Sequence, residues 1–443
     1  MAEKQAEEAK YRFCLFNKEL EKVSNSLVEP PGIFRGRGEH PHAGSLKSRI
    51  IPEMVTINTG LDDPIPKCPV AGHCWEAIVE NKEAAWLATF KDERASYAPR
   101  KYINLAADSK IKGENDKKKY EKARRLKEKI KTIRANYTAA MESSSVTDNQ
   151  LGVCTYLIDK LALRVGNEKG EDEADTVGCC SLRVEHIHLE DGSKVTFDFL
   201  GKDSMRYYNT VEVLPIVHRR LSEFVQGKEP SDDIFDKINA SRLNEYLKES
   251  MEDLSAKVFR TYNASITLQQ ELTGGQIDAE KDTVDAKLKF YNDCNRKVAL
   301  LCNHQKSVSK NHDEQMAKMN ESIDEIKEKL ARSEQLRKLY KQGKEPTGKL
   351  KEFADEKNNP KNLEQAEKVV AKLKEKLDKK EMLAKAKEDN KAVALGTSRI
   401  NYMDPRITIS WCKRKEVPIE KIFTPVLRSK FAWAMSNEPG WNF

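Results

Sequence analysis

Residues 397–406 read Thr-Ser-Arg-Ile-Asn-Tyr-Met-Asp-Pro-Arg, a short polar segment near the C-terminus of this 443-residue chain. Tyr402 lies between Arg399 and Arg406, and Pro405 limits how far a helix can continue. A tyrosine hydroxyl among cations can attack a phosphodiester, because the cations stabilise both the phenolate and the charge that builds on phosphorus. A tyrosine that only packs against a helix fits the same residues, so the choice between the two interpretations depends on the rest of the chain.

The composition describes a folded core together with a large solvated fraction. Charged residues make up 34% of the chain, hydrophobic residues make up 38%, and the formal net charge is +7. The length predicts two to four domains. No run of about 18 apolar residues and no apolar signal-peptide core occur, so we expect no association with a membrane. Nine cysteines, an odd number, do not suggest a disulfide framework and favour a reducing compartment.

No motif for a metal or a nucleotide cofactor stands out in the sequence. His186 and His188 alternate on a predicted strand, and Cys68, His73 and Cys74 are close in sequence. Neither set supplies four ligands at zinc-finger spacing. The chain also lacks a Walker A loop and a Gly-x-Gly-x-x-Gly motif after a strand. We therefore expect no cofactor, no metal at the functional site and no nucleotide-driven motor.

The patterning of residues predicts an α+β protein that is mostly helical. We expect an exposed helix and then an irregular segment over residues 1–29, and a small β-rich domain over residues 48–109. Residues 110–135 carry twelve Lys or Arg against four Asp or Glu, a net charge of +8. Most solvated helix faces mix both signs, so this imbalance favours a phosphate backbone nearby.

A glycine-arginine loop precedes the β-rich segment. In Pro30–Gly38, glycines alternate with Arg35 and Arg37, which gives a backbone able to approach a ligand closely and two cationic side chains. An ordinary surface turn fits this loop equally well.

A three-stranded antiparallel meander is predicted over residues 181–189, 195–199 and 205–213. Lys202 lies in the hairpin between the last two strands, where most lysines are simply exposed. A hairpin tip can also reach into a groove, so both interpretations stay open.

Three further basic residues lie in or at the ends of predicted helices. Arg164 falls in the last turn of a helix predicted over residues 151–164, where the helix dipole favours any cation. Arg260 and His304 interrupt or end otherwise apolar helical runs. A buried side chain with satisfied hydrogen bonds explains each of them singly.

The clearest local signal is a two-helix coiled coil between residues 311 and 390. Apolar residues recur at alternating steps of three and four over residues 316–330 and again over residues 363–377, with turn residues between the two series. This pattern predicts an antiparallel coiled coil with arms of roughly 40 Å or more. We expect it to protrude, because only its narrow seam is apolar.

Taken together, the motifs resemble those of eukaryotic type IB DNA topoisomerase I. Six of them occur in the family's order, with the coiled coil before the last pair: LALRVGNEKGEDEADTVGCCSLRVEHI, FDFLGKDSMRYYN, AKVFRTYNASITLQQEL, LLCNHQ, GTSRINYMDPRI and KFAWAM. The resemblance extends from about Pro30 to the C-terminus. It implies an enzyme that relaxes supercoiled DNA without ATP, through a tyrosine-linked nick, strand rotation and religation.

The resemblance also implies roles for individual residues. Tyr402 matches the nucleophile that forms a 3′-phosphotyrosine, and Lys202 matches the acid that protonates the departing 5′-oxygen. The residues that match those holding the scissile phosphate are Arg164, Arg260 and His304. The residues that match DNA-site positions are Arg35, Arg37, Lys112, Asp203 and Asn401, and of these Arg37, Asp203 and Asn401 match the site of the inhibitor camptothecin.

The resemblance further implies four domains. These are a partial DNA-clamping cap over 1–120, a catalytic core over 121–309, a coiled-coil linker over 310–391, and a C-terminal domain over 392–443 that carries the tyrosine. The implied partner is double-stranded DNA, bound mainly through its phosphates by a monomer in the nucleus.

One departure from the family and two alternatives accompany this interpretation. The family has a long charged tail and a further cap segment before the glycine-arginine loop, whereas about thirty residues precede the loop here, so we expect incomplete encirclement of DNA. A tyrosine recombinase uses a similar Arg-Lys-His-Arg-Tyr set, but the coiled coil and the wording of the motifs argue against it. A non-catalytic DNA-binding fragment is the alternative from a different class of protein.

Overall fold

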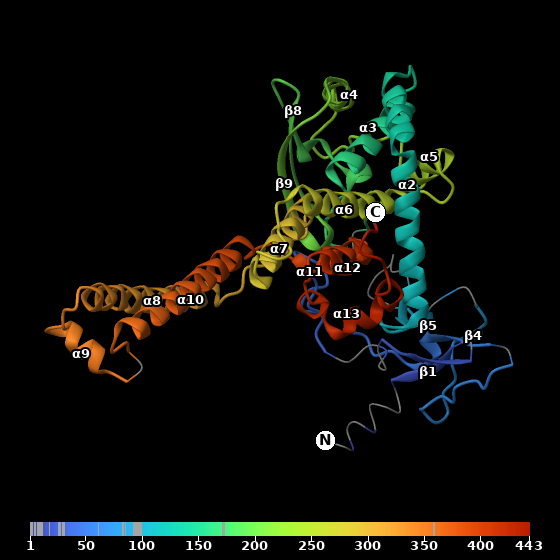
Figure 1. Ribbon diagram of the computed structural model, residues 1–443. Helices are drawn as coiled ribbons and strands as arrows, with labels where there is room; N and C mark the ends of the chain where they lie inside the picture. Colours follow the sequence, from blue (N-terminus) through green and yellow to red (C-terminus); the bar gives the residue numbers. More distant parts are fainter. Residues whose placement is uncertain are drawn as a thin grey trace. The chain divides into compact units, whose positions relative to one another are not determined.

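The chain folds into two compact units (Figure 1). The computed structural model describes Glu3, Ala6 and residues 12–443 except 17, 25–27, 29–31, 61, 82–83, 85, 92–99, 171–172 and 358. The first unit comprises residues 1–274, 301–303 and 399–443, and the second comprises residues 275–300 and 304–398. Helices dominate both units, and the described residues form three small sheets, so the protein is an α+β protein.

The first of these sheets is a two-stranded hairpin close to the N-terminus. β1 (Phe13–Phe16) pairs antiparallel with β2 (Glu19–Lys22), and Lys18 turns the chain with a φ of 66°. The predicted helix is therefore wrong for residues 13–22, because the aromatic and apolar residues of β1 favour a strand. Most of the predicted helix N-terminal to this hairpin lies outside the described residues.

A four-stranded sheet follows within the region where the sequence predicted a β-rich domain. Its order is β4 (Ala77–Val79), β3 (Val55–Asn58), β5 (Trp86–Phe90) and β6 (Lys101–Asn104). The β3–β4 pair is parallel, and the other two pairs are antiparallel. A small core of buried Val55, Ala88 and Phe90 holds the sheet together.

Two long helices of the first unit pack against each other. α2 (Lys110–Glu142) contains the basic segment, and α3 (Val146–Leu161) packs against it. Gly152 permits this close approach, because a Cβ there would lie 2.7 Å from the carbonyl oxygen of Tyr137. The basic segment is thus one exposed side of a helix whose other side is buried.

The end of α3 differs from the sequence prediction in a way that concerns Arg164. The helix stops at Leu161, and Ala162 takes a left-handed conformation with a φ of 49°. Arg164 therefore lies in the extended segment after the helix and not in its last turn. The amide nitrogen of Cys179 donates a hydrogen bond of 2.8 Å to the carbonyl oxygen of Arg164, which fixes this segment against residues 178–180.

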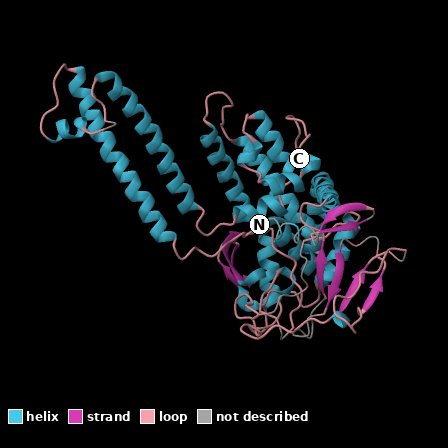
Figure 2. Cartoon of the chain, turned by 90° about the horizontal axis from the view of Figure 1, so that it is seen from below, coloured by secondary structure: helices cyan, strands magenta, loops and turns pink. Residues whose placement is uncertain are grey.

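The third sheet is a meander of three antiparallel strands, drawn in magenta in Figure 2. Its strands are β7 (Ile187–Glu190), β8 (Lys194–Gly201) and β9 (Met205–Glu212). The first strand starts later than predicted, because residues 179–181 and 184–186 form 3₁₀ turns. A further 3₁₀ turn, Lys202–Ser204, makes the hairpin tip between β8 and β9.

Helix α6 (Ala256–Gly274) is the central element of the first unit. It contacts α2, α3 and α12 (Pro405–Arg414), and nearly all of its first ten residues are buried. Shorter helices complete the unit: α4 (Pro215–Val225), α5 (Ala240–Ser250) and α13 (Pro425–Lys430). α11 (Leu395–Asn401) leads into the segment that carries Tyr402.

The second unit consists of helices. They are α7 (Val284–Leu301), α8 (His312–Lys341), α9 (Lys349–Asp355) and α10 (Leu363–Asp389). α8 and α10 lie side by side and antiparallel at the residues where the apolar steps predicted them (Figures 1 and 2). Ion pairs flank the seam, including Lys327 with Glu381 at 2.7 Å and Lys374 with Glu334 at 2.8 Å. None of the described helices has the length and apolar character needed to cross a membrane.

A buried carboxylate joins α2 to α3. The Asp159 side chain is fully buried, and its oxygens accept hydrogen bonds from Arg134 at 2.8 and 3.1 Å and from the Tyr137 hydroxyl at 3.0 Å. A buried charge of this kind is tolerated only while its partners are present.

We expect Asp159→Ala to lower the free energy of unfolding of the first unit by about 2–3 kcal/mol, because it leaves Arg134 and Tyr137 without their shared acceptor. Asp198→Ala is the control, since Asp198 accepts two bonds from the largely exposed Arg206 and solvent can replace them. Urea denaturation followed by tryptophan fluorescence measures this, because all five tryptophans belong to the first unit. Equal effects of the two substitutions would contradict the prediction.

Candidate active site

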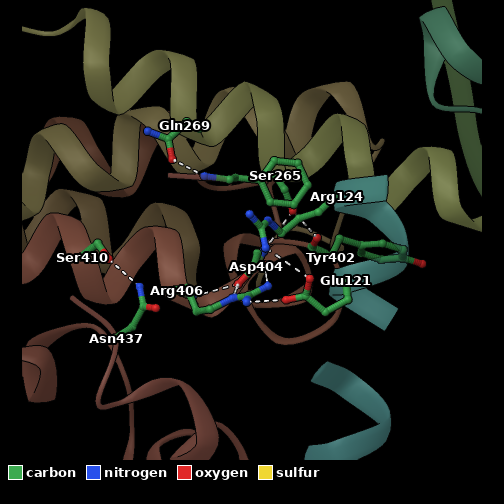
Figure 3. A network of polar contacts seen from close by, with 10 residues as sticks. Glu121, Arg124, Ser265, Gln269, Tyr402, Asp404, Arg406, Ser410 and Asn437 are labelled. Atoms are coloured by element: carbon green, nitrogen blue, oxygen red, sulfur yellow. Dashed lines mark hydrogen bonds and ion pairs between the residues drawn. The ribbon is translucent and has the colours of Figure 1, made fainter. Parts of the chain in front are cut away.

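Tyr402 lies in a short turn between α11 and α12. Its side chain is largely buried, with 9% of the residue exposed. The turn ends where the Asp404 carboxylate accepts a hydrogen bond from the backbone nitrogen of Arg406 and Pro405 begins α12. The Ser265 hydroxyl of α6 donates to the Tyr402 carbonyl oxygen at 3.2 Å and accepts from the Asp404 backbone nitrogen at 3.0 Å (Figure 3).

Two arginines from distant parts of the sequence act on the Tyr402 side chain. The Arg260 guanidinium lies 5.2 Å from the centre of the Tyr402 ring. The positive charge of Arg164 also acts on the Tyr402 side chain and lowers the pKa of its phenol. The structure thus brings Tyr402, Arg164 and Arg260 together.

The Arg260 side chain is held by backbone carbonyl groups. One terminal nitrogen donates to the carbonyl oxygen of Ala162 and the other to that of Cys302, each at 2.5 Å. Only 6% of the residue is exposed, and this burial is the main reason why the pKa of Arg260 is lowered from its usual value. These bonds fix the guanidinium over the Tyr402 ring.

The pKa of Tyr402 is set by opposing effects. Burial raises it, because the phenolate is poorly solvated, whereas the positive charges of Arg164 and Arg260 and the hydrogen bond from Arg164 lower it. The net result is a pKa of Tyr402 below the ordinary value for tyrosine. A phenol of this kind forms a nucleophilic phenolate more readily than an exposed tyrosine does.

The two arginines that flank Tyr402 in sequence have other partners. Arg399 donates to the carbonyl oxygen of Ile422 at 2.7 Å. Arg406 forms a buried ion pair with Asp404 at 2.7 Å and a second one with Glu121 of α2 at 2.5 Å (Figure 3). The expectation that these neighbours supply the cations is therefore corrected: the charges that lower the pKa of Tyr402 are those of Arg164 and Arg260.

A cavity of about 910 Å³ lies in the first unit and gathers most of the predicted basic residues. Its lining includes six of the ten predicted site residues: Arg35, Arg37, Arg164, Lys202, Asp203 and Arg260. Arg37 and Asp203 form an ion pair at 2.5 Å. Gly38 permits this contact between the glycine-arginine loop and the hairpin tip, because a Cβ there would lie 2.2 Å from the Ser204 hydroxyl oxygen.

Four predicted residues are not part of this lining: Tyr402, described above, and three others. Lys112 is in the first turn of α2, where burial and the charge of Lys430 lower its pKa. The Asn401 carbonyl oxygen accepts from the Lys119 side chain at 3.0 Å. His304 belongs to the second unit, where its Nδ1 is 2.6 Å from the Ser398 hydroxyl oxygen. A joint action of His304 with Tyr402 stays a prediction.

The sequence interpretation missed two polar residues of this region, Ser265 and Lys257. Both lie on α6, where Lys257 lines the cavity and Ser265 contacts the turn of Tyr402. The available signal was a set of polar residues within a helical run that carries Arg260. Among the described residues, no group of three or more His, Cys, Asp or Glu side chains is arranged to hold a metal ion.

We expect Arg164→Gln to raise the pKa of Tyr402, because burial then acts with less opposition from positive charge. The measurement is a pH titration by NMR of tyrosine labelled at Cζ, with Tyr402→Phe to assign the resonance. Arg206→Gln is the matched control, since Arg206 pairs with Asp198 on the meander. An unchanged titration of Tyr402 in Arg164→Gln would contradict this account of the site.

Comparison with known proteins places these observations in one family. The family model described as "Eukaryotic DNA topoisomerase I, catalytic core" matches residues 108–337. The model described as "Eukaryotic DNA topoisomerase I, DNA binding fragment" matches residues 1–105, and the "C-terminal topoisomerase domain" matches residues 374–443.

Similar proteins extend the comparison to whole sequences. DNA topoisomerase 1 beta of Arabidopsis thaliana is 47% identical over 443 residues, which cover 100% of this chain and 47% of that protein. DNA topoisomerase 1 of Caenorhabditis elegans is 46% identical over 446 residues, 98% of this chain and 52% of that protein. The Homo sapiens protein of the same name is 46% identical over 431 residues, 96% of this chain and 55% of that protein. The chain thus spans about half the length of these relatives, and it belongs to the eukaryotic DNA topoisomerase I family.

Proposed function

We propose that this chain is an ATP-independent type IB DNA topoisomerase, which relaxes supercoiled DNA by transient cleavage of one strand. The observation that carries the proposal is the position of the Tyr402 phenol beside Arg164 and Arg260, with a pKa below that of an ordinary tyrosine. Membership of the eukaryotic DNA topoisomerase I family and the names of the relatives support it.

In the proposed cleavage step, the Tyr402 oxygen attacks the phosphorus of a DNA phosphodiester. A bond forms between that oxygen and phosphorus, the bond from phosphorus to the 5′-oxygen breaks, and a 3′-phosphotyrosine results. Arg164 and Arg260 stabilise the charge on the non-bridging oxygens, because a guanidinium carries a fixed positive charge and donates strong charge-assisted hydrogen bonds. His304 is proposed to donate a third.

Lys202 is proposed as the general acid of the same step. The departing 5′-oxygen needs a proton, and Lys202 lines the same cavity as Arg164 and Arg260. Religation is the reverse reaction, in which the 5′-hydroxyl attacks the phosphotyrosine. No ATP is needed, because the phosphotyrosine keeps the energy of the broken bond.

The proposed substrate is double-stranded DNA, held mainly through its phosphates. The basic segment of α2 and the loop that carries Arg35 and Arg37 would supply cations along the backbone. Arg37, Asp203 and Asn401 would meet camptothecin-type inhibitors, by resemblance to the family. Action as a monomer in the nucleus, and the division into cap, core, linker and C-terminal domains, are parts of the same proposal.

We expect Tyr402→Phe to abolish relaxation of supercoiled plasmid while leaving the affinity for DNA within about twofold, since phosphate contacts and not the hydroxyl determine binding. A plasmid assay without ATP and a filter-binding assay at fixed salt measure the two quantities. A wild-type chain that binds DNA but never changes its topology would point to a DNA-binding fragment and overturn the proposal. Relaxation that survives Tyr402→Phe would overturn the assignment of the nucleophile.

We also expect strand cleavage to persist in EDTA, because the proposal meets the phosphoryl charge with arginine side chains. The measurement is the rate of covalent complex formation with and without EDTA. A slower relaxation with normal cleavage fits the proposal, since magnesium also acts on DNA itself. Complete loss of cleavage that added magnesium restores would contradict the proposed roles of Arg164 and Arg260.

A further inference from the structure

A buried hydroxyl closes the turn that presents the Tyr402 side chain. Ser265 is completely buried on α6, and its oxygen makes two hydrogen bonds to the turn Tyr402–Asp404 (Figure 3). It donates to the carbonyl oxygen of Tyr402 at 3.2 Å and accepts from the backbone nitrogen of Asp404 at 3.0 Å. One side chain thus bridges both ends of the turn and attaches it to α6.

The same helix carries Arg260, five residues earlier, whose guanidinium lies 5.2 Å from the centre of the Tyr402 ring. A five-residue separation corresponds to a rise of about 7.5 Å along a helix, and helix geometry fixes it. One rigid helix, α6, therefore holds both the backbone of Tyr402 and the cation that lies over the Tyr402 ring. A shift of the turn relative to α6 would change the distance from the phenol to Arg260.

The next part of the chain is anchored in a different way. The Asp404 carboxylate and Arg406 form a buried pair that also reaches Glu121 of α2. This pair holds the start of α12 against α2, whereas Ser265 holds the turn against α6. The Ser265 hydroxyl thus makes the two hydrogen bonds that attach the turn to α6, whereas the ion pairs of Arg406 attach α12 to α2.

We propose that Ser265 is a positioning residue that sets the Tyr402 phenol against Arg164 and Arg260. The inference rests on the proposed function and deepens it, because it names the contact that orients the nucleophile. Well-placed reacting groups matter greatly, since a misplacement of about 1 Å can cost roughly 10²-fold in rate.

Ser410 offers a matched control in the same unit. It is also completely buried, and its hydroxyl donates to the carbonyl oxygen of Glu438 at 2.7 Å and accepts from the Asn437 side chain at 2.8 Å (Figure 3). Ser265→Ala and Ser410→Ala each remove a buried hydroxyl with two hydrogen bonds. We expect similar decreases in melting temperature from both.

The experiment compares the two variants in two readouts. The first is the single-turnover rate of covalent complex formation on a nicked oligonucleotide duplex, with the dissociation constant for DNA measured in parallel. We expect Ser265→Ala to lower this rate by about 10- to 100-fold at an unchanged dissociation constant, and Ser410→Ala to change it less than about twofold. The second readout is the pKa of Tyr402 without DNA, which should rise toward the ordinary tyrosine value only in Ser265→Ala.

The outcomes separate this inference from the proposed function. Equal losses of rate in the two variants, or an unchanged rate and an unchanged pKa of Tyr402 in Ser265→Ala, would overturn the role of Ser265. A wild-type chain that forms no covalent complex would overturn the proposed function. A rise in the pKa of Tyr402 in Ser265→Ala would still support the positioning of the phenol in that case.

Discussion

The burial of the Arg260 guanidinium is the constraint on which the rest of the site depends. A buried cation is costly unless its donors are paired, and here the carbonyl oxygens of Ala162 and Cys302 accept from it. Both carbonyl groups follow the last residue of a helix, where such groups lack a partner within the helix. The left-handed residue Ala162 thus ends α3 and provides a carbonyl acceptor for Arg260. It also starts the extended segment that carries Arg164.

Small residues bring the other cationic groups close to this centre. Gly38 allows the loop with Arg35 and Arg37 to approach the hairpin tip with Lys202, so one cavity is lined by side chains from four separate segments. A cavity with this excess of positive charge suits a ligand with a negative backbone. The cationic side chains would then already be oriented toward the charge that develops on a transferred phosphoryl group. Little reorganisation of the protein would be needed during the reaction.

Local patterns predicted some elements well and could not predict others. The seam of α8 and α10 follows from apolar steps alone, because a coiled coil is specified by neighbouring residues. The end of α3 was missed, since an alanine gives no signal for a left-handed conformation. The expectation that Arg399 and Arg406 act on Tyr402 was wrong, because it relied on closeness in sequence. The cations that lower the pKa of Tyr402 are Arg164 and Arg260, which come from distant segments of the chain. Only the family resemblance singled out Arg164 and Arg260 as candidate site residues. A serine on a buried helix carries no pattern that would predict a role for Ser265.

The central claim is that the Tyr402 oxygen forms the covalent bond to DNA. The most direct measurement traps the chain on an oligonucleotide whose short fragment on the 3′ side of the cleaved bond, which carries the new 5′-hydroxyl, dissociates after cleavage. The product is then digested, and the modified peptide is identified by mass spectrometry. The account predicts a nucleotide joined through a 3′-phosphate to Tyr402, within a peptide that contains residues 400–404. A nucleotide on any other residue, or unmodified Tyr402 in a chain that has cleaved its substrate, would contradict it.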